Sequence, residues 1–388
     1  METDLNFVGK NIRFFRRSRN WTMSQLALKT GIQEPALGRI ERGLNLPSAK
    51  VLHNLSKVLN IPMDALFAKE PSHTPHQDSR TPDVSFVTPF ITIDKNPQIP
   101  PKSLLKACHE IMTAFHALED ICKAQKHAYL PLLIPFVPTY KGMDELAIRI
   151  RQYFGTGSAV VFDYFELFEN AGMRIILFPF TRGATKIESI SFYEPFFHNA
   201  FFFLNSRHNP EKQLFSICLE LGKILISNQI KLQGKSLFLK QTRANQNKNY
   251  QIKRPINPKR AAKRFAATML MPNEAVRTTV SQLGITPDNW SYELLLRIKH
   301  RFGISVQAFL YRLNELELIS PATSEKLDKK IKEYYKKTDN KEPDSTRRIL
   351  TPNGRFFDLL LTAENMDNMK DEIKQIKNLQ QRLKIIHK

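Results

Sequence analysis

The residues that come closest to a catalytic motif lie in the apolar stretch LFSICLELGKILIS, residues 214–227. A helix with His-Glu-x-x-His binds Zn²⁺ through two imidazoles one turn apart and uses the Glu between them as general base. The same frame here contains Leu219, Glu220 and Lys223. The carboxylate is present and both imidazoles are absent, so it is open whether this helix retains any catalytic chemistry.

The segments around this helix indicate an α+β domain over residues 141–320. Amphipathic patterns alternate with short runs of aromatic and β-branched residues, which favour strands. A turn at EPFFH separates two of these strands, and Asn209 with Pro210 opens the helix that carries Glu220. The expected elements are, in order, a helix at GMDELAIRIRQYFG, a helix and a strand within YFELFENAGMRIILFPF, strands at ESISFY and NAFFFLN, and helices at NPEKQLFSICLELGKILIS and PKRAAKRFAATMLMP.

This order of elements resembles the ImmA/IrrE family of metallopeptidase-like domains, whose fold is zincin-like. The resemblance rests on FFFLNSRHNPEKQLFSICLELGKILIS, AAKRFAATMLMP and FGISVQAFLYRLNELELI. It implies zinc-dependent endopeptidase chemistry, frequently on a partner repressor, with metal ligands at the positions of Leu219, Lys223 and Ala261 and the base at Glu220. Leucine and alanine have no lone pair, and a lysine ammonium repels a dication. We therefore predict a pseudoenzyme with no metal, no other cofactor and no catalytic residue.

Two interpretations of Glu220 are open at this point. In the first, Glu220 is a buried carboxylate that pairs with Lys223 three residues on, so that the ammonium replaces the charge of zinc. In the second, it is an ordinary helical glutamate on a partly exposed turn. The sequence does not decide between them.

Residues 1–69 are expected to form a separate all-α domain of five short helices. Helical periodicity runs from Phe7 to Phe67 with four breaks. Thr22 and Gln25 have the spacing of a capping box, in which each satisfies a backbone N–H of the first helical turn. Gly31 suits a tight turn with positive φ, and Pro35 suits the first turn of the next helix.

The stretch WTMSQLALKTGIQEPALGRIERGLNLPSAKVLHNLSKVLNIPMDALF resembles the helix-turn-helix of the XRE (lambda Cro/repressor) family. The resemblance implies binding to double-stranded DNA, with the second helix of the motif in the major groove. That helix corresponds to residues 33–42. Its outward positions are Gln33, Glu34, Ala36 and Arg39.

These outward residues are the candidates for contacts to the bases. Gln33 can pair with adenine, and Arg39 can reach guanine or phosphate. Glu34 must accept from a cytosine amino group or stay clear of the DNA. Met23 stands where the family often has Gln, so nearby residues would take over that backbone contact. The expected contacts to the DNA backbone come from Ser24, Gln25, Arg42, Asn45 and Lys50.

Three further segments complete the organisation of the chain. Residues 70–100 have the polar, proline-bearing composition of a linker. Residues 101–140 contain an expected bridging helix, Ser103 to His127. His109 and His116 on it are seven residues apart, about 10.5 Å along a helix axis, which is too far for one zinc ion. Residues 321–388 are expected to be a helical tail.

Two features of these outer segments have alternative interpretations. Residues 231–264 form a basic insert with eleven Lys and Arg and no acidic residue. Such a block is a solvated loop by default, and a second phosphate-contact surface is the alternative. In the tail, a stripe at helical spacing favours packing on the body of the protein over a short dimer seam. Its members are Ile373, Ile376, Leu379, Leu383 and Ile386.

The composition limits the partners and the compartment. Lys and Arg number 58 against 37 Asp and Glu, a net charge of +21 that favours polyanionic partners. Three cysteines without a framework pattern indicate a reducing compartment. The sequence has no signal pattern and no apolar run long enough for a membrane span. We expect a soluble, cytoplasmic protein.

These observations predict a multidomain, sequence-specific DNA-binding transcriptional regulator of bacterial type. Its second domain would be a metal-free pseudo-peptidase that senses a protein or small-molecule effector or makes a homodimer. One alternative is a zinc metallo-endopeptidase that cleaves a repressor. Another is an antitoxin-like module that binds a protein and not DNA.

Overall fold

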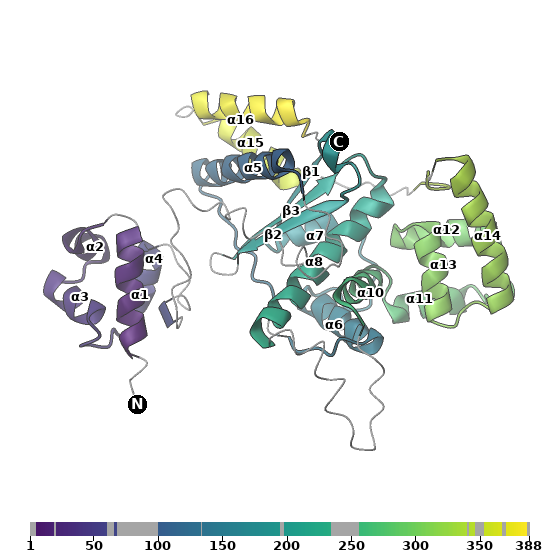
Figure 1. The fold of residues 1–388 in the computed structure, drawn as a ribbon, viewed down its shortest axis with the longest axis horizontal. Coiled ribbons are helices and arrows are strands. Elements are labelled where there is room, and N and C mark those ends of the chain that lie inside the picture. The colour runs from purple at the N-terminus through teal and green to yellow at the C-terminus, as the bar shows by residue number, and fades with distance from the viewer. Residues whose placement is uncertain are drawn as a thin grey trace, which may run out of the picture. The chain divides into compact units, whose positions relative to one another are not determined.

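The computed structural model divides the chain into two compact units, with residues 1–83 in the first and most of the remainder in the second (Figure 1). It describes residues 5–18, 21–59, 66–67, 100–132, 134–194, 198–233, 256–339, 341–345, 353–366 and 370–385. The predicted linker therefore lies outside the described residues except for its last residue. Within the described ranges, no helix is both long and apolar enough to cross a membrane.

The first unit is a bundle of short helices, as predicted. Its described helices are α1 (Leu5–Ser18), α2 (Met23–Thr30), α3 (Glu34–Glu41) and α4 (Ala49–Val58). Their inward faces share one apolar core, which is fully buried at Ile12, Leu26 and Leu37. Of the expected fifth helix, the structure describes only Leu66 and Phe67, which form a 3₁₀ turn.

The second unit is built on a three-stranded sheet of β1 (Arg174–Phe178), β2 (Ser189–Glu194) and β3 (Asn199–Asn205). The strand order is β1-β3-β2, and β1 runs parallel to β3. The predicted strands are thus confirmed. Successive side chains of a strand point to opposite faces, so Phe202 packs into one core and Phe201 and Phe203 into the other. Both faces of the sheet are buried.

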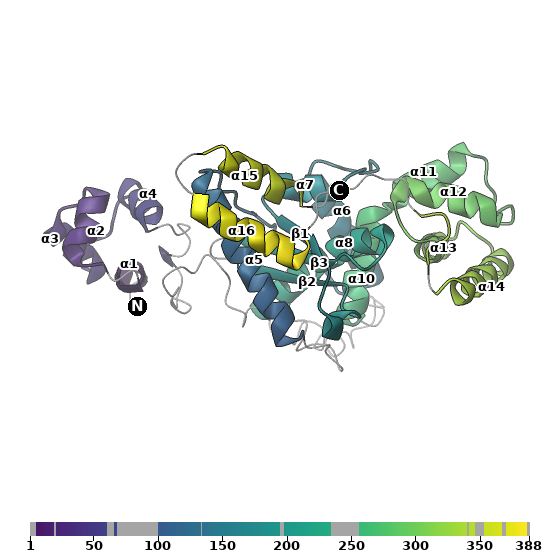
Figure 2. The same cartoon turned by 90° about the horizontal axis from the view of Figure 1, so that it is seen from above.

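One face of the sheet is covered by α5 (Lys102–Ile121), α15 (Gly354–Glu364) and α16 (Lys370–Leu383) (Figures 1 and 2). The expected bridging helix is therefore part of the domain core. It ends at Ile121 and not at His127, because Lys123 adopts φ 51° and the N–H of Ala124 donates to the carbonyl of Glu119 in a helix-ending turn.

The structure places the two histidines of α5 apart from each other and packs the apolar stripe of α16 into the core on this face. His109 is exposed, whereas His116 is buried beside Glu119, so the two do not converge on one metal. The stripe on α16 packs inward, as predicted, with Ile373 and Ile376 buried in this core. Ile386, the last member of the stripe, lies outside the described residues.

The opposite face of the sheet is covered by α6 (Tyr140–Tyr153), α7 (Tyr164–Asn170), α8 (Pro210–Gln233) and α10 (Pro258–Leu270) (Figure 1). Helices α8 and α10 pack closely because Gly222 has no side chain. A Cβ at that position would lie 2.7 Å from Cδ1 of Phe265. The backbones of α8 and α10 therefore approach each other closely at Gly222.

The remaining described helices are α11 (Asn273–Gln282), α12 (Tyr292–Phe302), α13 (Val306–Glu315) and α14 (Pro321–Lys337), and Arg182–Ala184 form a 3₁₀ turn, η4. Leu327 and Ile331 of α14 pack with α13 in the same buried cluster as α8 and α10, although residues from 321 onward were expected to form a tail. The basic insert is also shorter than expected, because α8 extends to Gln233 and α10 begins at Pro258. Residues 234–255 lie outside the described residues.

Candidate functional site

The turn between α2 and α3 has the geometry that the sequence predicted. The backbone N–H of Thr22 donates to the side chain of Gln25, and the N–H of Gln25 donates to the Thr22 hydroxyl, which completes the capping box. Gly31 ends α2 with φ 67°, and Pro35 lies in the first turn of α3. The angle between the two helices is therefore set by local residues whose conformations match the turn.

Helix α3 presents a row of polar side chains to solvent. Gln33, Glu34 and Arg39 are exposed, while Leu37 and Ile40 of the same helix are buried in the core. Ala36 is half-buried, so it offers only a methyl group at the surface. The face that could meet base edges is thus a short one with a single cation and a single anion.

A buried ion pair between α1 and α3, which was not predicted from the sequence, fixes the position of this face. The Arg16 guanidinium donates to both carboxylate oxygens of Glu41, at 2.6 and 2.8 Å, and also to the carbonyl of Trp21 at 2.9 Å. Both side chains are below 10% exposed. Two-pronged pairing of this kind has a defined orientation, so it holds α3 rigidly against α1. Opposite charges 25 residues apart give no local signal.

The residues predicted to contact the DNA backbone are exposed. They are Ser24, Gln25, Arg42, Asn45 and Lys50. Arg42 donates to the carbonyl of Gly38 at 3.0 Å, which orients its guanidinium along the end of α3. The carbonyl oxygen of Gln25 is used in the capping box, so only its amide NH₂ can donate to a phosphate.

In the second unit, helix α8 has a buried carboxylate near its centre. Glu220 on α8 has no solvent exposure. The hydroxyls of Ser189 and Ser191 donate to its two oxygens at 2.7 and 2.6 Å, and the ammonium of Lys223 donates at 2.6 Å. The first interpretation of Glu220, a buried partner of Lys223, therefore matches the geometry, and the exposed-turn interpretation does not.

The two serines were not predicted as part of this site. They lie two residues apart on β2, so both face the same side of the sheet, toward α8. A weak signal is present in the sequence, because hydroxyls at alternate positions interrupt the apolar pattern of ESISFY. That signal has no meaning until the strand is placed beside α8.

The donor set does not fit a zinc ion. Leu219 is half-buried and Ala261 fully buried, and the Lys223 ammonium is already bound to Glu220. Burial raises the pKa of the neighbouring Cys218 thiol far above its usual value, so this sulfur stays protonated and is a poor ligand. Across the part of the chain that the structure describes, no group of three or more His, Cys, Asp or Glu side chains could hold a metal.

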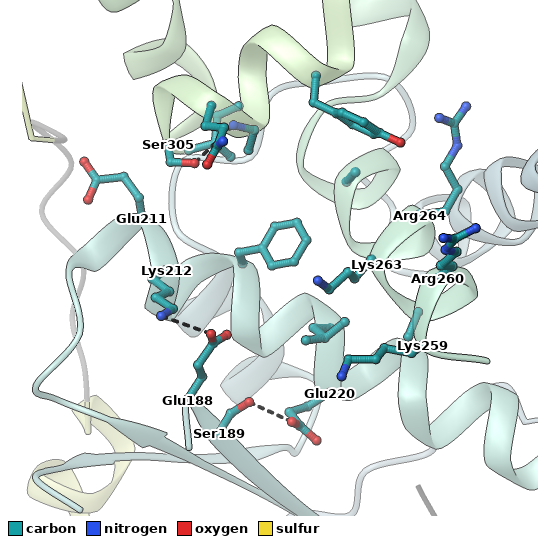
Figure 3. A pocket seen from close by; sticks show the side chains of 18 of the residues that line it. Glu188, Ser189, Glu211, Lys212, Glu220, Lys259, Arg260, Lys263, Arg264 and Ser305 are labelled. Carbon is teal, nitrogen blue, oxygen red and sulfur yellow. Dashed lines mark hydrogen bonds and ion pairs between the residues drawn. The ribbon is translucent and has the colours of Figure 1, made fainter. Parts of the chain in front are cut away.

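A cavity of about 1270 Å³ opens over Glu220, between α8, α10 and the segment that leads into β2. Figure 3 shows Glu211 and Lys212 on one side of this cavity and Lys259, Arg260, Lys263 and Arg264 of α10 on the other. We call this cavity the α10 cleft. The charged groups that Figure 3 labels on its α10 side are cationic.

The wall of the cleft contains a buried polar network that the sequence analysis also missed. The Arg264 guanidinium donates to both carboxylate oxygens of Asp144, and Arg312 donates to Glu315 at 2.7 Å. Arg264 also pairs with Glu315, and Thr268 donates to Asp144. The pKa of Arg264 is raised: burial opposes the shift, and the bonds to Asp144 and Glu315 outweigh burial. These charges are internally neutralised and rigid.

Comparison with protein-family models gives two matches on this chain. A helix-turn-helix model matches residues 12–66, and an IrrE N-terminal-like domain model matches residues 168–314. The second match contains β1 to β3, α8 and α10, and therefore the whole surroundings of Glu220. The two resemblances that the sequence suggested are thus confirmed, as is the order of an all-α unit followed by an α+β unit.

The similar curated proteins are HTH-type transcriptional regulators. YazB of Bacillus subtilis is 42% identical over 62 residues, which are 16% of this chain and 90% of that protein. Rv0474 of Mycobacterium tuberculosis is 33% identical over 84 residues, 22% of this chain and 60% of that protein. SutR of Escherichia coli is 32% identical over 75 residues, 19% of this chain and 42% of that protein. The chain thus spans less than two thirds of the length of the latter two.

Proposed function

We propose that this chain, which belongs to the HTH-type transcriptional regulators, binds specific sites on double-stranded DNA in the cytoplasm through α3 of its first unit. The observation that carries the proposal is the exposed row Gln33, Glu34 and Arg39 on a helix fixed by a buried ion pair. A rigid helix with exposed polar side chains meets the requirement for reading bases in the major groove. The net charge of +21 supplies the attraction to phosphate.

The test is selection of bound duplexes from a random library, followed by titration of the full-length protein with the selected site. Arg39→Ala and Gln33→Ala are each expected to relax base preference at one position and to cost about 1–3 kcal/mol for the selected site. Lys50→Ala should weaken selected and random duplexes about equally. Arg13→Ala, an exposed arginine on α1, is the matched control. If all variants and wild type bind selected and random duplexes alike, the assignment of α3 is wrong.

We further propose that the chain acts as a homodimer. Regulators of this type commonly place two helix-turn-helix units about 34 Å apart, so that they read a two-fold symmetric site. The selected sites should then contain two inverted copies of one half-site, about 10 base pairs apart from centre to centre. A single unpaired half-site among the selected sequences would argue for a monomer.

The second unit is, in this proposal, a pseudo-peptidase that senses or dimerises and does not cut. The support is the chemistry at the ligand positions: two apolar side chains and an ammonium that is bound to Glu220. Peptide hydrolysis by this fold needs a metal to polarise the carbonyl and to lower the pKa of the attacking water. Glu220 is fully buried and already accepts hydrogen bonds from three donors.

Elemental mass spectrometry of the untagged protein, after exposure to zinc and desalting, tests this second proposal. We expect less than about 0.1 zinc per chain, because the residues that the structure describes offer no ligand set. About one zinc per chain would support the alternative, a zinc metallo-endopeptidase. The other alternative, an antitoxin-like protein-binding module, would be favoured if duplex affinity lacked the steep salt dependence of phosphate contacts.

A further inference from the structure

The α10 cleft contains cations that its own carboxylates do not neutralise. The acidic side chains of the lining are already paired: Glu188 with Lys212, Glu220 with Lys223, and Glu315 with the two arginines of the buried network. The other two, Glu211 and Glu342, pair with the fully buried Lys299. The carboxylates of the cleft are therefore occupied by partners other than its exposed cations.

Three exposed cations of the lining form no ion pair with any carboxylate that the structure describes. They are Lys186, which precedes β2, and Arg260 and Lys263 on α10. They come from two segments far apart in the sequence and line one cavity. Figure 3 shows Arg260 and Lys263 on the same wall, with Lys263 directed into the open space. This positive charge is uncompensated within the described residues.

The position of these cations on α10 is unfavourable for the helix alone. The first turn of α10 contains Lys259 and Arg260 and no acidic residue, although the positive end of the helix dipole favours anions there. Lys259 and Lys263 are also spaced four residues apart, which places like charges next to each other. By contrast, the first turn of α16 contains Asp371 and Glu372. A bound anion would relieve both unfavourable terms in α10.

The floor of the cleft is apolar. Phe215 and Leu219 on α8 are half-buried there, and Tyr311 of α13 is 61% exposed at the rim. Leu219 lies at the position of a former metal ligand, so the loss of the imidazole makes the floor more apolar. The cleft therefore has an apolar floor between charged walls, and a ligand with an apolar ring and anionic groups matches this lining.

We propose that the α10 cleft binds a small organic polyphosphate, with its phosphates on Arg260, Lys263 and Lys186 and its planar ring on the floor at Phe215. The cavity, about 1270 Å³, is slightly larger than the range of about 300–1,000 Å³ usual for small-molecule sites, so it has room for such a ligand. The inference deepens the proposed sensory role of the second unit, and it rests on that unit being free of zinc. It assigns no reaction to the ligand.

The test is isothermal titration of the full-length protein with ATP and with inorganic triphosphate, in buffer without Mg²⁺. We expect ATP to bind more tightly than triphosphate, because only ATP has a ring for the floor. The double variant Arg260→Gln, Lys263→Gln should weaken both anions at least tenfold. The control is Lys370→Gln, Lys374→Gln, which removes two exposed charges four residues apart on α16 and should change neither affinity.

The proposal is overturned if neither anion binds below 1 mM, or if the α10 variant binds both like wild type. Equal affinity for ATP and triphosphate would mean that the ring does not pack on Phe215, and that part of the proposal would be wrong. Competition with a single-stranded oligonucleotide and with an acidic peptide separates the other ligand classes: if either binds in the cleft and neither small anion does, the small-ligand assignment is wrong. Zinc content of the same preparation shows separately whether the pseudo-peptidase proposal has failed.

Discussion

Replacing Glu220 by Gln separates a structural carboxylate from a catalytic one. In a zinc peptidase the general base is available to water, and its amide analogue removes activity with little effect on the fold. Here the carboxylate is fully buried and holds Ser189, Ser191 and Lys223. We therefore expect Glu220→Gln to lower the stability of the second unit.

The size of the effect follows from the three contacts. A hydrogen bond to a charged group contributes about 1.5–3 kcal/mol, and removing one partner of a buried ion pair costs about 3–5 kcal/mol. Two features reduce the loss. The glutamine amide can still bond to the Ser189 and Ser191 hydroxyls, and Lys223 is 24% exposed, so water can solvate its ammonium. The expected loss is about 2–4 kcal/mol.

Urea unfolding followed by tryptophan fluorescence measures this loss in the intact chain. The sequence has two tryptophans, so a Trp21→Phe background leaves Trp290, which lies in the same core as α8. Glu145→Gln is the matched control, because Glu145 is an exposed helical glutamate near Lys141 and should change stability by less than about 0.5 kcal/mol. A Glu220→Gln value as small as the control would refute the structural role of the carboxylate.

Two further predictions concern the other buried charges. Arg16→Met should destabilise the first unit by about 3–5 kcal/mol, because it leaves Glu41 buried without its partner. Arg17→Met, at an exposed position, is the control, and the unfolding midpoint of each variant gives its stability. Burial alone would raise the pKa of Glu119, but the hydrogen bond of a neighbouring histidine and the charge of Arg174 outweigh it and lower the pKa to about 2. The stability that this carboxylate contributes is complete above about pH 4.5 and is lost as the pH falls toward 2. Glu119→Gln should therefore reduce the acid-induced loss of unfolding free energy by about 3 kcal/mol. An unchanged dependence of stability on pH would contradict this.

The pairing of Glu220 with Lys223 could be predicted from sequence because the two residues are local. Positions 219, 220 and 223 lie within two turns of one helix, and the spacing alone brings Glu220 within reach of Lys223. Ser189 and Ser191 could not be predicted, since their contact needs the register of β2 and its placement against α8. Each such contact joins residues about 30 positions apart.

The ends of the elements show the same division between local and distant causes. The capping box of α2 and its Gly31 end were predicted, because both signals lie inside the turn itself. The early end of α5 was not, since Lys123 adopts a left-handed conformation that usually belongs to glycine. The tight packing at Gly222 depends on Phe265 of another helix, so a glycine in the interior of α8 had no explanation in the sequence.

If the proposed homodimer forms, a ligand in the α10 cleft can affect operator binding without touching α3, by changing the way in which two chains associate. Joining two helix-turn-helix units makes the second DNA contact intramolecular, with an effective concentration set by the geometry of the joined units. A ligand that changes dimerisation therefore changes affinity for a paired site and leaves the affinity of one half-site unchanged. Titration of both duplexes with and without ATP tests this route. An equal shift for the single half-site would mean that the ligand acts on each chain separately, and regulation through dimer geometry would be wrong.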